Sequence, residues 1–374
     1  MSAFDTAPDR RGSDSVKWGR YAGRDVLPLW VADMDFAAPP AVIEALHQRV
    51  EHGVFGYPQP WPSLTESVLA YLDDRYGWSI QAEWLVWLPG LVTGLNLACR
   101  AAAGGVLTAT PVYPPFLSAP AHAGLSLARA DLVLEGGRWT WDWGALQAAC
   151  QPETRLLLLC HPHNPVGRCW DDDELQALAE FAARYDLLVC SDEIHCDLIL
   201  DGRRHRPFAT LGPECAARSI TLMAPSKTYN VPGLGCAFAV IPDAGLRRAF
   251  RRAMDGIVPH VNLFGLVACE AALRHGGAWH RDLIAYLAAN RDAVQAAVAA
   301  LPGLAMAPVE ATYLAWIDAR GLGQTRPAAH LERHGLGLSE GADFGAPGWV
   351  RLNFGCPRTT LDSALARLAA ACAP

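Results

Sequence analysis

The sequence predicts an α/β fold, with a mostly parallel, doubly wound sheet in a large domain and a smaller α+β domain beside it. Two observations lead to this prediction. From about residue 84 to residue 241, short apolar runs alternate with amphipathic stretches of helical period. Runs such as RLLLLC, at 155–160, also lack polar residues at alternate positions, as expected for strands that helices cover on both faces.

The elements of the large domain follow from these patterns. Helices are expected at 39–53 and 62–77, because each stretch opens with proline and closes with glycine. The strands expected after them are EWLVWL, VLTAT, LSLARADLVL, RLLLLC, LLVCSDE, SITLMA and GCAFAVI. The helices expected between them are GLNLACRAAA, DWGALQAAC and DDDELQALAEFAARYD, with a proline-rich loop after VLTAT.

From about residue 262 the pattern changes to long helices, which are followed by a shorter series of strands and helices. That series contains the strands ATYLAWID and GWVRLNF and the helices PAAHLERHG and TLDSALARLAAAC. We therefore predict an N-terminal segment (1–45) that joins the small domain, a large domain (46–279) and a small C-terminal domain (280–374).

Composition and charge narrow the class of partner. Charged residues make up 18% of the 374 residues, and the net charge is −7 with a pI near 5.9. Nucleic acids and anionic membranes both require a basic face, so neither is expected as a partner, and a small molecule is. The polar N-terminus and the lack of an apolar run of about 20 residues predict a cytoplasmic protein without a membrane span.

The eleven cysteines are scattered without a C-x-x-C pair, which predicts reduced core residues. One group of Cys and His residues raises the question of a metal site, because their strands could be neighbours. These residues are Cys160, His161, His163, Cys190, His195 and Cys196. They show none of the usual zinc spacings, so the sequence predicts no metal.

Ligands of such sheets bind beyond the carboxyl ends of the strands, so the polar residues that follow each apolar run are candidates. In chain order these are the amides of Val92 and Thr93, then Tyr113, Asn164, Asp192 with His195, and Lys227. Each has an ordinary structural explanation: a strand–helix turn, core packing, an Asn-Pro turn, a helix cap and a solvated loop charge. Their joint occurrence at successive strand ends favours a binding site.

Together these groups suit pyridoxal 5′-phosphate (PLP). A lysine can bind its aldehyde, a carboxylate can keep its ring nitrogen protonated, and an amide can bind its ring hydroxyl. The same lysine can remove the α-proton of an amino-acid substrate, since desolvation and cationic neighbours lower its pKa.

The order HNP, SDEIH, SKTYN and RLN resembles the fold-type I, aspartate-aminotransferase-like PLP enzymes. Within them the sequence is most similar to the MalY/PatB branch of cystathionine β-lyase-like C–S lyases. The matching blocks extend from residue 27 to residue 358: LPLWVADMDF, HGVFGYP, TPVYPPF, CHPHNPVGR, SDEIHCDL, APSKTYNVPGL, ATYLAWID and RLNFGCPR.

The resemblance implies roles for individual residues. Lys227 would form the Schiff base, Asp192 would pair with the pyridine nitrogen, and Asn164 with His195 would serve the ring hydroxyl side. Tyr113 would stack on the ring, and the amides of Val92 and Thr93 with Ser226 would hold the phosphate. Arg351 would bind the substrate's α-carboxylate through two hydrogen bonds. Tyr57 would reach the cofactor phosphate of a neighbouring subunit, which implies a homodimer.

Two positions depart from many aminotransferases of this type. Gly235 stands where they carry a phosphate-binding arginine, and Ala224 stands where they often carry serine, so the phosphate has fewer charged partners. Asp33 and Asp35, in VADMDF, are expected near the site without an assigned step.

The resemblance implies a C–S β-lyase that converts a cystathionine-like or S-substituted cysteine to a thiol, pyruvate and ammonia. An aminotransferase is the alternative, because it needs the same residues around the cofactor. A regulatory protein that keeps the fold and the cofactor without turnover is a third possibility.

Overall fold

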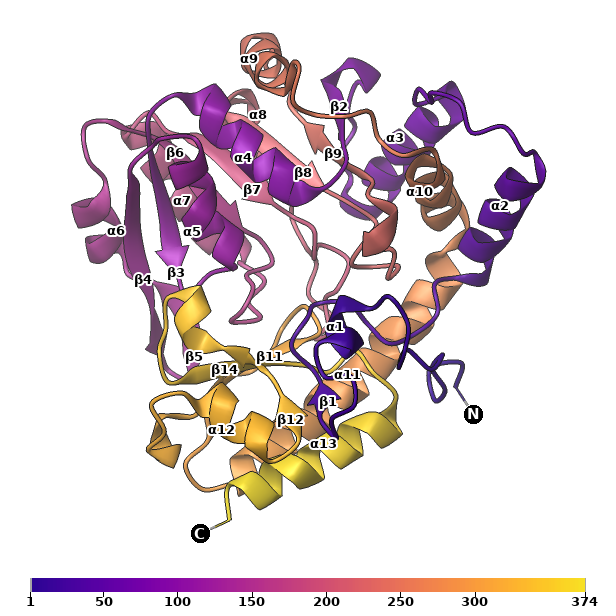
Figure 1. Ribbon diagram of the computed structural model, residues 1–374. Coiled ribbons are helices and arrows are strands. Elements are labelled where there is room, and N and C mark those ends of the chain that lie inside the picture. Colours follow the sequence, from indigo (N-terminus) through magenta and orange to yellow (C-terminus); the bar gives the residue numbers. More distant parts are fainter. Residues whose placement is uncertain (1, 374) are drawn as a thin grey trace.

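The computed structural model describes residues 2–373, and its largest feature is a sheet of eight strands in the order β2-β9-β8-β7-β6-β3-β4-β5 (Figure 1). The strands are β2 (Leu85–Leu88), β3 (Gly105–Thr110), β4 (Leu127–Glu135), β5 (Arg138–Trp141), β6 (Thr154–Cys160), β7 (Leu188–Asp192), β8 (Ser219–Met223) and β9 (Ala237–Val240). The central strands from β4 to β8 pair in parallel, while β2, β9 and β5 pair antiparallel at the two edges. The predicted mostly parallel sheet is confirmed.

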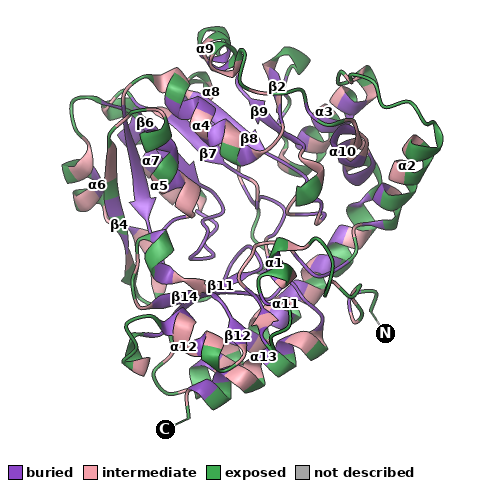
Figure 2. Ribbon diagram, in the orientation of Figure 1, coloured by how far each residue is buried: buried purple, intermediate pink, exposed green. Residues whose placement is uncertain are grey.

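Helices cover both faces of this sheet, and the side chains of β6 show why the strand is apolar throughout. Leu156 and Leu158 pack into the core on one face, whereas Leu157 and Leu159 pack into the core on the other. The helices that follow the strands are α4 (Leu91–Ala102), α5 (Pro114–His122), α6 (Trp143–Ala149), α7 (Asp172–Arg184), α8 (Pro213–Ala217) and α9 (Ala244–Met254). Figure 2 shows the central strands β6, β7 and β8 buried, while helices such as α6 and α9 expose one side.

The C-terminal part contains a second sheet of four antiparallel strands, in the order β10-β11-β14-β13. Its strands are β10 (Ala305–Met306), β11 (Leu314–Asp318), β13 (Ser339–Glu340) and β14 (Trp349–Asn353). The helices of this half are α10 (Leu263–His275), α11 (Gly277–Ala300), α12 (Pro327–Arg333) and α13 (Arg358–Ala371). The small sheet lies below the main sheet in Figure 1.

The N-terminal segment packs with this C-terminal part. Strand β1 (Leu27–Pro28) pairs in parallel with β12 (Leu336–Gly337). Phe4 and Phe36 lie in the same hydrophobic core as Leu283 of α11. The remaining helices near the N-terminus are α1 (Val16–Gly19), α2 (Pro40–Glu51) and α3 (Pro62–Tyr76). The domain boundaries at 45/46 and 279/280 stay predictions.

Two elements differ from expectation. The stretch expected as a proline-rich loop forms α5, because Pro114 occupies the first helical position, where no amide hydrogen bond is lost. Strand β5 was not anticipated, yet it forms a hairpin with β4 through Gly136 and Gly137. Both glycines adopt positive φ angles, 56° and 79°, as tight hairpin turns require, so the Gly-Gly pair was the available signal.

No helix among the described residues is long and apolar enough to cross a bilayer. All eleven cysteines are free, and nine of them are buried, in agreement with their prediction as reduced core residues.

Candidate active site

A pocket of about 610 Å³ lies between the carboxyl ends of the main-sheet strands and the small sheet. It brings together the candidates from five strand ends and one strand of the small sheet. The sequence-predicted residues that line it are Val92, Thr93, Tyr113, Asn164, Asp192, His195, Ser226, Lys227 and Arg351. Tyr57 lies outside the pocket and is fully exposed, with 100% of its surface accessible.

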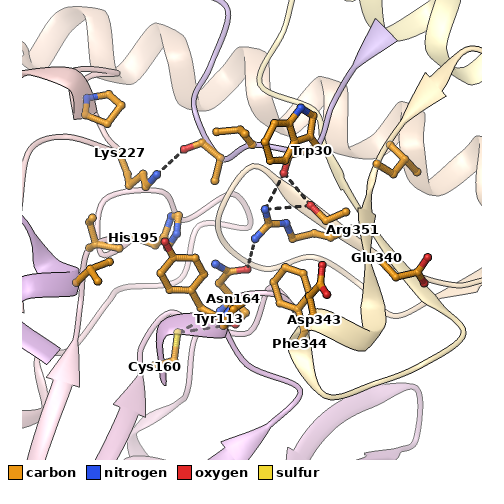
Figure 3. Close-up of a pocket in the computed structure, with 18 of the residues that line it drawn as sticks. Trp30, Tyr113, Cys160, Asn164, His195, Lys227, Glu340, Asp343, Phe344 and Arg351 are labelled. Atoms are coloured by element: carbon orange, nitrogen blue, oxygen red, sulfur yellow. Dashed lines mark hydrogen bonds between the residues drawn. The ribbon is translucent and has the colours of Figure 1, made fainter. Parts of the chain in front are cut away.

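Lys227 follows β8 and carries its amine into the pocket (Figure 3). The amine donates a hydrogen bond to the backbone carbonyl of Ala32, in the segment after β1. Burial and the nearby Arg351 lower the pKa of Lys227 to about 8, although Asp33 and Asp192 act in the opposite direction. A substantial fraction of this amine is therefore neutral and nucleophilic near neutral pH.

Asp192 is the last residue of β7, and it is buried with few groups nearby that stabilise a charged carboxylate. Its Oδ1 accepts a hydrogen bond of 3.2 Å from the amide of Ile194. Burial raises the pKa of Asp192 to about 7, although that amide and Lys227 both favour the ionised form. A cationic nitrogen placed in the pocket would supply the missing partner.

His195 and Tyr113 form part of the pocket wall near Lys227 (Figure 3). Among the described residues, nothing hydrogen-bonds to Nδ1 of His195. Burial lowers the pKa of His195 well below its ordinary value, and Lys227 and Arg351 act in the same direction, so the ring is neutral. Tyr113 is anchored by its amide, which donates a 3.0 Å hydrogen bond to the carbonyl of Asn164. These groups present a neutral ring nitrogen and an aromatic face to the pocket.

Arg351, on β14, is a buried cation that forms no ion pair with an acidic side chain of residues 2–373. Its Nη1 donates to Oδ1 of Asn164 at 3.1 Å, and its Nη2 donates to the carbonyl of Trp30 at 2.8 Å. Its Nε has no partner within residues 2–373, and its guanidinium lies 4.7 Å from the ring centre of Phe344. Burial lowers the pKa of Arg351 to about 10. A carboxylate entering the pocket would complete its hydrogen bonding.

The start of α4 offers free backbone amides to the pocket. Gly90 precedes the helix and has no side chain to cap it, and the first-turn residues Leu91, Val92 and Thr93 line the pocket. Helix N-termini bind phosphate through such amides and the positive end of the helix dipole.

The structure also explains the glycine that replaces a phosphate-binding arginine. Gly235 adopts a φ of 61°, a left-handed conformation that favours glycine, and a Cβ there would lie 3.2 Å from the carbonyl oxygen of Pro89. An arginine at this position is disfavoured by the backbone, so the amides at the start of α4 and Ser226 remain as candidate phosphate ligands in this pocket. Ala224, the other departure, is buried in the core.

These features fit PLP. A partly neutral amine can bind its aldehyde, an under-partnered buried carboxyl can pair with its ring nitrogen, and free helix amides can hold its phosphate. Arg351 is left for the carboxylate of an amino-acid substrate.

Several residues of the pocket were missed by sequence reasoning. They are Trp30, Ser339, Glu340, Asp343 and Phe344. Trp30 lies within the LPLWVADMDF block, so its signal was present. The others belong to the two-residue strand β13 and to the short helical turn that follows it, which no sequence pattern predicted.

Asp33 and Asp35 do not line the pocket. Arg10 binds both, at 2.6 Å to Asp33 and 2.8 Å to Asp35, and the buried Lys17 binds Asp35 at 2.9 Å. They fix the N-terminal segment against the molecule, close enough for Asp33 to act on the pKa of Lys227.

Comparison with known proteins agrees with this geometry. The family model of aminotransferase class I and II matches residues 24–368. Cystathionine β-lyase PatB of Bacillus subtilis is 37% identical over 98% of this chain and 99% of its own length.

Two solved structures are similar to this chain over nearly its whole length. The crystal structure of OvoB has a TM-score of 0.97 at 51% identity, covering 99% of this chain and 98% of that one. Cystalysin from Treponema denticola, which contains PLP, has a TM-score of 0.94 at 32% identity over the same shares. The resemblance inferred from the motifs is confirmed, and the chain belongs to the aminotransferase class I and II family, in its branch of PatB-type cystathionine β-lyases.

Proposed function

We propose that this protein is a PLP-dependent C–S β-lyase that cleaves the Cβ–S bond of a cystathionine-like or S-substituted cysteine. The observation that carries the proposal is the presence, in one pocket, of a partly neutral Lys227 and a buried Arg351 that has no carboxylate partner in the described part of the chain. The similarity to PatB over the whole chain supports β-elimination over other reactions of the family.

The pocket residues have separate roles in this reaction. Arg351 holds the substrate's α-carboxylate, while Asp192 holds a proton on the cofactor's ring nitrogen. When PLP is bound, its protonated ring withdraws electron density from the substrate's α-carbon. Lys227 takes the proton from that carbon, the Cβ–S bond breaks, and the sulfur leaves with the bond's electron pair as a thiolate. Protonation of the thiolate and hydrolysis of the remaining fragment give a thiol, pyruvate and ammonia.

The lining of the pocket also includes charged side chains of both signs. They are Arg20, Arg326, Glu332, Glu340 and Asp343. Glu340 has a buried Oε2 without a hydrogen-bond partner among residues 2–373, and burial together with nearby Asp343 raises its pKa. A leaving group with an ammonium and a carboxylate of its own complements these charges, so a cystathionine-like thioether is the preferred substrate over a short S-alkyl cysteine.

We further propose a homodimer in which Tyr57 reaches the cofactor phosphate of the other subunit. The segment around it exposes apolar side chains, with 61% of Val54 and 57% of Phe55 accessible beside the fully exposed Tyr57. Such a patch is typical of a protein interface. The free cysteines suit a reducing compartment, which supports a cytoplasmic location.

The test follows pyruvate and free thiol together, with PLP and L-cystathionine present and no keto acid. Equal amounts of both products, absent with the Lys227→Ala variant, are expected. Lys227→Ala should lower turnover by at least about 10³-fold, because it removes the base and the cofactor anchor. A strict requirement for a keto acid would instead support the aminotransferase, and inactivity on all thioethers and keto acids would support a non-catalytic protein.

The preference for a cystathionine-like substrate is tested by comparing two thioethers. Cystathionine should be cleaved with a higher kcat/KM than S-methylcysteine, and Glu340→Gln should reduce that preference. If Glu340→Gln keeps the same preference for cystathionine over S-methylcysteine, the role assigned to Glu340 is wrong. The proposed lyase reaction would still stand.

A further inference from the structure

Outside the active-site pocket, two histidines and a cysteine meet in the interior. His161 directly follows β6, Cys169 lies in the loop before α7, and His205 lies between β7 and β8. All three side chains are buried, and the potential ligand atoms of the three residues lie within 4.8 Å of one another. The two imidazole rings are nearly stacked, with centres 4.3 Å apart.

The hydrogen bonds of the two histidines leave one lone pair on each ring. Nε2 of His161 lies 3.1 Å from the carbonyl oxygen of Arg206, which can only accept, so this nitrogen carries the proton and Nδ1 does not. Nε2 of His205 lies 2.8 Å from Oε2 of Glu193. The carboxylate form of Glu193 accepts from Nε2 and fixes the same tautomer in His205. Burial raises the pKa of Glu193 to about 7, so this form prevails above that pH.

Both Nδ1 atoms are buried and have no hydrogen-bond partner within residues 2–373. Unpaired buried acceptors are uncommon, because desolvation without a hydrogen bond costs free energy. Burial also lowers the pKa values of His161 and His205 to about 3, so protons do not compete for these lone pairs near neutral pH.

Cys169 supplies a sulfur beside these nitrogens. Its exposed fraction is 1%, and burial raises its thiol pKa to about 12. The nearby Glu310 and Asp201 act in the same direction, while Arg203 and Arg168 oppose them. The thiol is therefore protonated until a cation binds and displaces its proton to solvent.

We propose that His161, Cys169 and His205 bind one Zn²⁺ ion through the two Nδ1 atoms and Sγ. Two imidazoles and a thiolate are ligands that Zn²⁺ prefers, with bonds of about 2.0–2.3 Å. The carbonyl of Arg206 and the carboxylate of Glu193 already hold the opposite ring nitrogens, as outer partners of metal-bound histidines usually do. The ligand atoms, which lie within 4.8 Å of one another, are near enough for one ion to draw them together.

This site differs from the group of Cys and His residues considered from the sequence. Of that group only His161 takes part. Nε2 of His163 lies 2.8 Å from the carbonyl oxygen of Pro111, and Cys160 and His195 line the active-site pocket. The site could not be predicted from the sequence, because its ligands follow no recognised zinc spacing.

The ion also has a route inward and an effect on the fold. His205 lines a second pocket, of about 320 Å³, whose wall includes Arg203, a residue with a 39% exposed side chain. Glu193, which holds His205, directly follows Asp192 in the active site. Metal binding should therefore stabilise the turn that carries Asp192 and raise the melting temperature of the PLP-loaded protein.

Cobalt is the direct probe, because Co²⁺ in a tetrahedral site with a thiolate gives visible bands at longer wavelengths than PLP absorbs. Reduced, metal-depleted PLP-loaded protein should bind one Co²⁺ per chain with these bands, and Zn²⁺ should abolish them. Cys169→Ser and His205→Gln should lose the bands, whereas Cys99→Ala, at a buried cysteine elsewhere, should keep them.

Bands that are absent from the wild type, or that persist in Cys169→Ser, would overturn the proposal. If the variants fail to fold, X-ray absorption of the zinc-loaded wild type decides the matter. A shell with one sulfur and two imidazole nitrogens supports the site, and a shell of nitrogen and oxygen alone contradicts it.

Discussion

Two buried carboxylates five residues apart, Asp192 and Asp197, have opposite surroundings. Their exposed fractions are 5% and 7%. Asp192 accepts one hydrogen bond from the protein, and burial raises its pKa to about 7. For Asp197 burial acts in the same direction, yet His280, Arg75 and the hydroxyls of two tyrosines outweigh it and lower its pKa.

The partners of Asp197 nearly saturate its two oxygens. Tyr71 donates to Oδ2, Tyr76 donates to Oδ1 at 2.8 Å, and Arg75 donates to Oδ1 at 3.1 Å. This cluster is complete without a ligand, whereas the groups of the active-site pocket are left with unused hydrogen-bonding capacity. The difference indicates that the Asp197 cluster stabilises the fold and that Asp192 is held ready for a ligand.

Within this comparison, the largest effect is expected from the substitution of an arginine in the pocket, with an arginine of the Asp197 cluster as its control. Arg351→Lys should lower kcat/KM for cystathionine by about 100-fold, because lysine cannot make the two-pronged bond to a carboxylate. The melting temperature should change little. The matched control is Arg75→Lys in the Asp197 cluster, which should lower stability and leave kcat/KM nearly unchanged. Equal effects of the two substitutions on kcat/KM would contradict the comparison.

A smaller effect concerns pH. Because the pKa of Lys227 is lowered to about 8, its neutral form dominates above that pH and declines about tenfold for each unit below it. The rate at which the apo-protein takes up PLP, followed by absorbance, should rise between pH 6 and pH 8 and then level off. A rise centred near 10.5, the ordinary lysine value, would show that Lys227 is not buried as described.

The smallest effect concerns Tyr57. Tyr57→Phe should weaken PLP binding about fivefold, as expected for the loss of one hydrogen bond, and should leave the dimer intact. Tyr185→Phe, outside both the pocket and the Asp197 cluster, is the control. Fluorescence titration with PLP and light scattering measure the two properties. If the Tyr57→Phe variant is a dimer and its affinity for PLP is unchanged, Tyr57 does not bind the cofactor phosphate.

Much of the site could be predicted because the carboxyl ends of successive strands meet at one edge of the sheet. Apolar runs located the ends of β6 and β7, and the polar residues after them proved to share one pocket. Arg351 could be assigned only through resemblance, since its strand belongs to a different sheet.

Other features depend on contacts that a linear pattern does not encode. Glu340 and Asp343 reach the pocket from a two-residue strand and a short helical turn, and Cys169 and His205, which are distant in the sequence, lie together only in the folded structure. The saturation of Asp197 was equally hidden, because its partners come from α3 and α11, far away in the sequence.

The most direct test compares Asp192→Asn with Asp197→Asn by thermal unfolding at pH 8, with and without PLP. The raised pKa of Asp192 means that its contribution to stability is present below its ordinary pKa of 3.8 and is lost as pH rises through about 7. At pH 8 the ionised carboxyl is a cost to the apo-protein that asparagine avoids.

Asp192→Asn should therefore leave the apo-protein as stable as the wild type or more stable, and should lose most of the stabilisation that PLP confers. Asp197→Asn should destabilise the apo-protein by about 2–4 kcal/mol, since it leaves buried partners unpaired, and should keep that stabilisation. Two results would contradict the assignment of Asp192 to the cofactor. One is an equal loss of apo-protein stability in both variants. The other is a stabilisation by PLP that is lost in Asp197→Asn and kept in Asp192→Asn.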